Sequence, residues 1–305
     1  MTPNNQPEHP RLAYSPQALA ACEKALRTIL TKIGPWGTRL VLIGGMAPRY
    51  LVGDLPADIP EHVGTTDLDI VVGIALESEE DEAYRTLQQN LKDAQFAPRR
   101  NPDTNQEETF RWTREVDGVS VVLEFFCPVG EGNTGQLLRN PGKNVGSKIS
   151  AMRIRGAELA GRDHITINLG GELLDHGGIQ ERIEVRVCNL LPLLVLKSFA
   201  IDERDKSKDS YDLVWILNAF QEGPASVVDA IASSPVIDHA DIPVAIQAIR
   251  THFQSTGHRG PSQYANFELM ADDAEQRERL RRHAHGTVAE FLRLWDSRGL
   301  PGAIG

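Results

Sequence analysis

Short apolar runs separated by polar turns occur through the first two thirds of the chain, and they predict β-strands. Runs rich in β-branched residues and bounded by glycine, proline or polar residues favour this structure. The strands are expected at 40–43, 67–74, 111–114, 119–126, 165–169 and 183–187. The pair Asp117-Gly118 lies between the third and fourth of these runs and is typical of a tight β-hairpin.

Apolar residues three and four positions apart predict helices in the rest of the chain. The first helix is expected to begin at Ser15, which caps it, with Pro16 in the first turn, and to end near residue 33. Further helices are expected at 46–52, 77–94, 190–203, 208–220, 225–233, 241–255 and 272–297. Residues 1–13 are rich in proline and asparagine and are predicted to be disordered, and residues 98–109 are predicted to form a loop.

This distribution predicts an α+β protein, with a mixed β-sheet and flanking helices followed by helices alone. The chain has 305 residues, of which 41% are hydrophobic, enough for a sizeable core and for two domains. We expect an α/β domain at 14–189 and a helical domain at 190–305. No apolar run approaches the length of a membrane span, and the first residues have no signal-peptide core, so a cytoplasmic protein without membrane contact is predicted.

Charge and cysteine content narrow the class of partners. The net charge of −10 argues against general nucleic-acid binding. The segment 139–162 nevertheless contains six basic residues and one acid, a local charge of 6 − 1 = +5. This segment is either a solvated surface or a binding surface for nucleotide phosphates or an RNA backbone. Cys22, Cys127 and Cys188 have no metal-ligand spacing and are expected to be reduced and buried.

Two aspartates are the most informative feature of the chain. Asp67 and Asp69 begin an apolar strand, and alternate residues of a strand face the same side. Like charges repel at that separation, so the pair favours a hard divalent cation such as Mg²⁺. The strand before them ends in Gly44-Gly45, where backbone amides can approach a phosphate, and Glu124 is a third acid within a later apolar strand. These residues predict a two-metal phosphoryl-transfer site; the alternative is a strand edge with solvated acids.

A second group of charges lies in the helical part. Lys197 is on the apolar stripe of the helix expected at 190–203, and a lysine that faces the interior needs an anion. Asp209 and Asp212 are expected at the start of the next helix, on its inward face, where the helix dipole favours acids. Two interpretations are open. One is a structural ion pair of Lys197 with an aspartate; in the other, Lys197 binds a triphosphate and Asp209 orients the lysine, a metal or the acceptor.

These motifs resemble those of a known superfamily. The glycine pair, Asp67-x-Asp69 and Glu124 are similar to the motif of nucleotidyltransferases of the DNA polymerase β type. The segment Leu193–Leu217 and the Lys-Ser-Phe-Ala run that it contains resemble the AbiEii/AbiGii family, as do its Arg-x-Lys-x-Lys-Asp and Tyr-Asp-Leu elements. Members of that family are nucleotidyltransferase-like toxins of bacterial abortive-infection and toxin–antitoxin systems. The likeness covers about residues 38–220.

The resemblance implies a nucleotidyltransferase-like mixed sheet with flanking helices and a C-terminal helical domain. It implies transfer of a nucleoside monophosphate from an NTP, with two Mg²⁺ ions, to an RNA acceptor such as the tRNA acceptor end, and a cognate antitoxin as partner. The roles implied are metal binding by Asp67, Asp69 and Glu124, nucleotide binding by Gly44, Gly45, Thr66, Lys197 and Asp212, and catalysis by Asp67, Asp69, Glu124, Lys197 and Asp209.

The chain departs from the family pattern in three places. Gly45 and Asp67 are 22 residues apart, so that 53–66 is an insertion. Gly45 stands where the family often has serine, and the arginine that usually precedes the aspartates is absent, with His62 or Arg49 as substitutes. Two other functions therefore stay open. One is nucleotidyl transfer to a small cationic drug such as an aminoglycoside; the other is a catalytically silent fold that acts as a binding or antitoxin partner.

Overall fold

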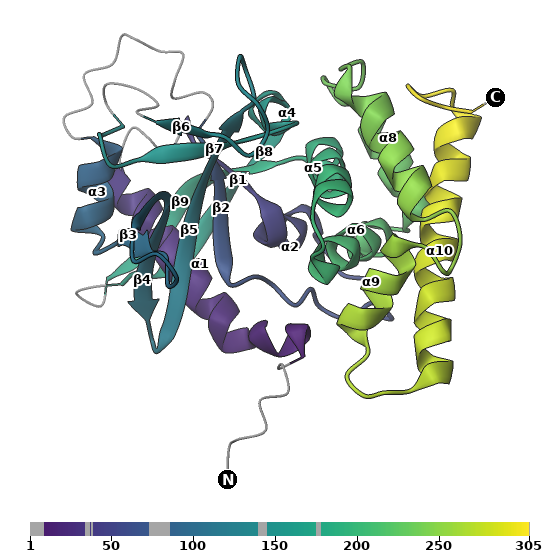
Figure 1. The fold of residues 1–305 in the computed structure, drawn as a ribbon, viewed down its shortest axis with the longest axis horizontal. Helices are drawn as coiled ribbons and strands as arrows, with labels where there is room; N and C mark the ends of the chain where they lie inside the picture. The colour runs from purple at the N-terminus through teal and green to yellow at the C-terminus, as the bar shows by residue number, and fades with distance from the viewer. Residues whose placement is uncertain are drawn as a thin grey trace.

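A nine-stranded mixed sheet with packed helices, followed from residue 190 by helices alone, makes up the protein (Figure 1). The computed structural model describes residues 9–33, 37, 39–72, 86–139, 145–174 and 178–304. The predicted α+β class is confirmed. The nucleotidyltransferase-like fold and the division into two domains stay predictions. No helix in these ranges is long and apolar enough to cross a membrane.

The sheet contains both parallel and antiparallel pairs of strands. Their bounds are β1 Val41–Ile43, β2 Asp67–Val71, β3 Ala97–Arg100, β4 Glu107–Val116, β5 Val119–Pro128, β6 Leu137–Arg139, β7 Ser150–Ile154, β8 His164–Glu172 and β9 Ile179–Cys188. Their order across the sheet is β3-β4-β5-β2-β1-β9-β8, and β7 pairs with both β5 and β6. The pairs β1/β9, β2/β5 and β5/β7 are parallel. All six predicted strands are present.

Three strands and two helices were not predicted. Most of β3 and the first residues of β4 lie within 98–109, so the loop predicted there is wrong for half of its length and right for residues 101–106. The helices are α1 Pro16–Ile33, α2 Ala47–Leu51, α3 Leu87–Asp93, α4 Ala157–Arg162, α5 Leu190–Glu203, α6 Ser207–Ala219, α7 Pro224–Ile231, α8 Asp241–His252, α9 Arg259–Glu268 and α10 Ala274–Ser297. Helices α4 and α9 were not predicted. Helix α3 is the last part of the helix predicted at 77–94, and the earlier part of that helix lies largely outside the described residues.

The predicted disordered N-terminus needs a correction at its end. Residues Pro10–Ala13 form a 3₁₀-helix, because the His9 side chain accepts the backbone N–H of Arg11 and the Arg11 guanidinium contacts Glu268 of α9. Residues 1–8 lie outside the described residues. The contact with α9 orders a segment whose composition alone predicts disorder.

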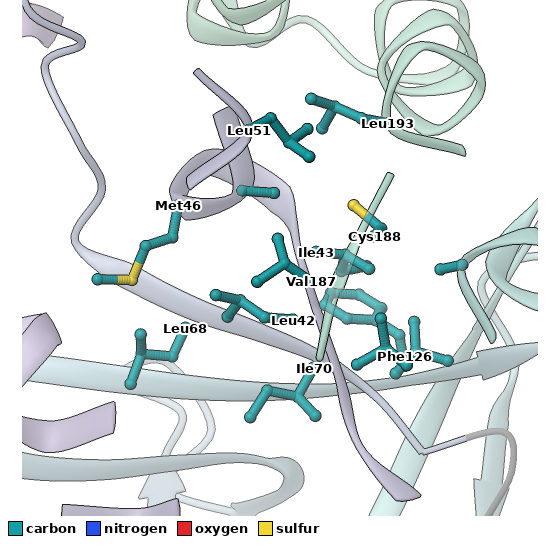
Figure 2. Packing of buried hydrophobic residues seen from close by; sticks show 14 of the residues in the cluster. Leu42, Ile43, Met46, Leu51, Leu68, Ile70, Phe126, Val187, Cys188 and Leu193 are labelled. Carbon is teal, nitrogen blue, oxygen red and sulfur yellow. The ribbon is translucent and has the colours of Figure 1, made fainter. Parts of the chain in front are cut away.

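Burial on both faces explains the continuous apolar runs near the centre of the sheet. All residues of β1 are buried, as expected for a strand between parallel and antiparallel neighbours that is covered on both sides. Figure 2 shows Leu42 and Ile43 of β1 packed near Ile70 of β2 and Val187 of β9. One apolar cluster continues from these strands into α5, α6, α7, α8 and α10. The three cysteines are buried and unpaired, as predicted.

Helix α2 lies between the sheet and the C-terminal helices (Figure 1). Leu51 at the end of α2 faces Leu193 of α5, and Met46 at its start packs near Leu68 of β2 (Figure 2). These contacts bring the glycine turn between β1 and α2 close to α5. The packing therefore places the two predicted groups of charges in one region.

Candidate functional site

A glycine turn after β1 carries the first predicted site residues. Ile43 of β1 pairs with Asp69 of β2, and the chain then leaves the strand through Gly44, whose φ is +71°. Glycine adopts this backbone region without the steric cost that other residues meet. A Cβ at Gly44 would lie 1.9 Å from Oδ2 of Asp69. The turn therefore requires glycine for its backbone and for its space, and the Asp69 carboxylate lies directly against it.

Strands β2 and β5 bring the three predicted acids to neighbouring positions. The strands are parallel, with Asp69 opposite Glu124, and Asp67 lies two residues before Asp69 on the same face. Burial, then the charges of Glu124 and Asp67, raise the pKa of Asp69 to about 7. Burial is the largest cause of this shift, and the negative charges of Glu124 and Asp67 add to it. A bound divalent cation would relieve this repulsion.

Glu124 already has a cationic partner within the protein. Arg111 lies opposite Glu124 on the neighbouring strand β4 and donates from Nε to Oε1 of Glu124 over 2.5 Å. The same guanidinium is 3.5 Å from Glu108. Arg111 was not predicted as a site residue, although the two-residue turn at Asp117-Gly118 sets the register that places it opposite Glu124. One oxygen of Glu124 is left without a bond to Arg111.

The carboxylate oxygens of Asp67, Asp69 and Glu124 are not as close to one another as the ligand atoms of a preformed metal site. Across the described ranges, the one group of three side chains with a ligand atom each within 4.8 Å of one another is Glu158, His239 and Asp241. In that group, Arg155 donates to Asp241 over 2.6 Å and compensates its charge. At the predicted site, the fit to a hard cation therefore rests on the adjacent carboxylates and on the raised pKa of Asp69.

The charges of α5 and α6 form a buried network. Lys197 Nζ lies 2.9 Å from Asp209 Oδ1 and 2.6 Å from Asp212 Oδ2. Arg204 donates to both oxygens of Asp209, over 2.8 and 2.9 Å. Burial opposes the charge of Lys197, but the two carboxylates outweigh it and raise the pKa of the lysine. The ion pair that the sequence offered as one of two interpretations is therefore present.

Two further side chains belong to this network: Lys208, which was not predicted, and His62, which the sequence offered only as a substitute for the missing arginine. Lys208 Nζ donates to Asp212 Oδ1 over 2.7 Å, and His62 Nε2 lies 2.8 Å from the same oxygen. Burial lowers the pKa of His62 to about 4, so the ring is neutral; its Nδ1 accepts the N–H of Gly64, which leaves Nε2 as the donor. The four-residue spacing between Lys208 and Asp212 on one helix face is the sequence feature that indicates their contact.

The two residues named as substitutes for the missing arginine have other partners. His62 bonds to Asp212, and Arg49 lies 3.3 Å from Glu23 of α1. Neither contacts the aspartate pair of β2. The cation nearest to Asp67 is Lys206, whose Nζ lies 4.0 Å from Oδ2.

The network carries excess positive charge. With Lys208 protonated, three cations (Lys197, Arg204 and Lys208) face two anions (Asp209 and Asp212), which leaves 3 − 2 = +1. Burial lowers the pKa of Lys208, and the adjacent Asp212 opposes that change. For Asp212, burial alone would raise the pKa, yet Lys197 and Lys208 hold it well below its usual range. The charges of Asp69 and Glu124 also act on Arg204, so the acids of the sheet offset this excess.

A cavity of about 260 Å³ connects the acids with this network. Gly44, Asp69, Lys197 and Arg204 all line it. Much of the remaining wall is apolar and comes from β5, β7 and α5: Phe126, Met152, Ile154, Leu193, Leu196 and Phe199. The other predicted site residues, Gly45, Thr66, Asp67, Glu124, Asp209 and Asp212, are not part of its lining.

The basic segment 139–162 is partly neutralised by neighbouring groups. Lys148 bonds to Glu107 over 2.8 Å, and Arg155 bonds to Asp241. The Arg153 guanidinium donates to the backbone carbonyl of Val129. Residues 140–144 lie outside the described residues, and with them one of the six basic side chains.

No protein-family model matches this chain, and comparison with curated proteins gives no match either. The resemblance to nucleotidyltransferases therefore stays a prediction from the sequence motifs. The geometry of the cavity and of the charges around it is the basis for a functional proposal.

Proposed function

We propose that this protein is a Mg²⁺-dependent nucleotidyltransferase, which transfers a nucleoside monophosphate from an NTP to an acceptor hydroxyl. The observation that carries this proposal is the cavity that Asp69 and Lys197 line together. Phosphoryl transfer needs carboxylates that hold a metal–phosphate complex and fixed cations that neutralise the charge on the phosphates. The strand β2 and the helix α5 supply these two kinds of group on one cavity.

The roles of the individual residues follow from their contacts. Asp67 and Asp69 would hold the divalent cation, which when bound neutralises charge on the triphosphate and lowers the pKa of the attacking hydroxyl. The ammonium of Lys197 donates a hydrogen bond to Asp209 and is ion-paired with Asp212, and its remaining N–H donors can bond to a phosphate oxygen. The glycine turn at Gly44 admits a phosphate close to the backbone.

In the reaction, the acceptor oxygen bonds to the α-phosphorus while the bond to the pyrophosphate oxygen breaks. Glu124 keeps one oxygen that Arg111 does not use and lies beside Asp69 in the sheet, so it is placed to accept the proton of the acceptor hydroxyl. Asp209 and Asp212 hold Lys197 in place from the other side. In this proposal, Glu124 of the sheet accepts the proton and Lys197 of helix α5 binds the phosphates.

For the acceptor we propose RNA, with the tRNA acceptor end implied by the sequence resemblance, and for the protein partner a cognate antitoxin. The basic segment 139–162 supports the choice of RNA over a small cationic drug, because a drug of that kind prefers an acidic surface. Lys148 and Arg155 contribute less than the sequence suggested, since both are ion-paired.

A catalytically silent fold is the second candidate function. It is favoured by the internal pairing of the charges, since Arg111 bonds to Glu124 and Lys197 bonds to two aspartates without any ligand. Such a protein would bind a nucleotide or a partner protein and transfer nothing.

The decisive experiment incubates the purified protein with each NTP labelled at the α-phosphate, with Mg²⁺ and with total RNA or an aminoglycoside. Labelled RNA is expected from the unchanged protein and none from Asp67→Asn or Asp69→Asn, while the exposed Asp238→Asn serves as the matched control. Transfer that persists in Asp69→Asn would overturn the assignment. Calorimetry then separates the candidates, because binding of Mg²⁺–NTP without transfer supports a silent fold that binds nucleotide, whereas absence of binding excludes the transferase and leaves only a silent fold that binds a partner protein.

A further inference from the structure

The cavity beside Asp69 and Lys197 has more apolar surface than phosphate binding requires. Phe126 of β5 and Met152 and Ile154 of β7 contribute to its wall, as do several side chains of α5. Its volume of about 260 Å³ lies just below the range of about 300–1,000 Å³ that is typical of small-molecule sites. The cavity therefore suits one flat ring system and leaves the triphosphate outside it.

One wall of the cavity is also suited to an aromatic ring. The Arg155 guanidinium carbon lies 4.6 Å from the centroid of the Phe199 ring, and both residues line the cavity. Aromatic rings and stacked guanidinium groups bind the faces of nucleobases, and this stacking does not depend on which base is present. Apolar walls and a stacked cation together favour a nucleobase over an aliphatic ligand.

The polar side chain of this cavity that is available to bond to the edge of such a ring is a hydrogen-bond acceptor. Glu203 lines the cavity at the end of α5, and no side chain in the described ranges bonds to it, whereas Arg155 is held by Asp241 and Arg204 by Asp209. An ionised carboxylate accepts hydrogen bonds and donates none. It therefore favours a ring edge that carries an N–H donor.

We propose that this cavity binds the base of the NTP and that Glu203 selects bases with an exocyclic amino group, which are cytosine, adenine and guanine, over uracil. A carboxylate that accepts from such an amino group is a known mode of base recognition. The inference rests on the proposed function, because that proposal places the triphosphate at Gly44 and Lys197, next to the same cavity.

The first test compares CTP with inorganic tripolyphosphate, both with Mg²⁺, by calorimetry. Leu196→Trp fills the cavity from a half-buried position and is expected to weaken CTP binding about tenfold or more, with the affinity for tripolyphosphate unchanged. Leu12→Trp, at an exposed position remote in sequence, controls for the added tryptophan. Equal CTP affinity in Leu196→Trp and in the unchanged protein would overturn the inference while the proposed function stands. A protein that binds neither ligand would instead refute the proposed function.

The second test concerns base selection and uses an exposed position that leaves the fold intact. The unchanged protein is expected to bind CTP about tenfold more tightly than UTP, because the hydrogen bond from the amino group of cytosine to Glu203 is absent with uracil. Glu203→Gln is expected to bring the two affinities close together, because the glutamine side chain also donates, to O4 of uracil. The neighbouring Asp202→Asn is the control. Equal affinity for CTP and UTP in the unchanged protein would contradict the role of Glu203.

Discussion

The ammonium of Lys197 lies 2.6 Å from Oδ2 of Asp212, and both side chains are buried. Lys208 and His62 approach the other oxygen of the same carboxylate. A structural ion pair needs one cation for each carboxylate, whereas two lysines lie against the carboxylate of Asp212. This arrangement holds the ammonium of Lys197 at the wall of the cavity, and it links the stability of the fold to the phosphate-binding role proposed for Lys197.

Replacing Lys197 with methionine should lower the free energy of unfolding by about 3 kcal/mol, because two buried carboxylates lose a partner. Arg204→Met is the matched variant. It also removes a partner of Asp209, but its side chain is 53% exposed, so a loss of at most about 1 kcal/mol is expected. Urea denaturation at pH 7 measures both values. Equal losses of unfolding free energy in the two variants would contradict the prediction that the buried Lys197 ion pairs stabilise the fold. If a folded Lys197→Met protein binds tripolyphosphate as tightly as the unchanged protein, Lys197 has only the structural role of an ion pair.

Gly44→Ala should destabilise the protein more than Gly118→Ala does. Both glycines have positive φ, +71° and +79°, so each alanine meets backbone strain of about 1–2 kcal/mol. At Gly44 the new Cβ also collides with Asp69, whereas no atom lies within 4 Å of a Cβ at Gly118. The collision should add about 1–3 kcal/mol and displace the carboxylate. Chemical denaturation measures the difference, and similar losses for the two variants would show that Asp69 moves away freely.

Asp69→Asn should stabilise the protein at pH 8 and have little effect at pH 4. The pKa of Asp69 is raised from 3.8 to about 7, so between these pH values the folded state binds more protons than the unfolded state. Stability contributed by protonated Asp69 is therefore lost as the pH rises from about 4 to 7. The gain in the variant at pH 8 should be on the order of 2 kcal/mol.

Guanidinium denaturation at pH 4 and pH 8, in the absence of divalent cations, measures this effect. Asp238→Asn, at an exposed position, is the control. Addition of Mg²⁺ at pH 8 should stabilise the unchanged protein and have little effect on Asp69→Asn. The same pH dependence in both proteins would mean that Asp69 titrates normally.

Arg111→Leu should strengthen Mg²⁺ binding about fivefold, or about 1 kcal/mol, because the cation that bonds to Glu124 is removed. Arg100→Leu, whose side chain on the neighbouring strand β3 is 62% exposed, controls for the lost positive charge. Calorimetric titration with Mg²⁺ measures the affinity. Weaker Mg²⁺ binding in Arg111→Leu would instead show that Arg111 holds Glu124 in the geometry that the metal requires.

The strands and helices that the sequence predicted are those with strong local periodicity. β1 has a continuous apolar run because it is buried on both faces, whereas buried and less buried residues alternate along much of β2 and β5, and α5 is apolar on nearly every side. The missed strands are short, and β3 (Ala97–Arg100) contains proline and two arginines. Such a segment becomes a strand through pairing with β4, at the edge of the sheet, and its own composition does not indicate it.

The sequence by itself determined the order of elements, the apolar core and the acids and cations that lie at strand and helix ends, since these depend on the periodicity of neighbouring residues. The tertiary structure alone decided which charges far apart in the sequence meet. Asp69 lies opposite Glu124 across the parallel strands β2 and β5, and His62 bonds to Asp212 across 150 residues of sequence. Strand register and helix packing create such contacts, and these are set by burial summed over the whole core, which no local pattern of residues contains.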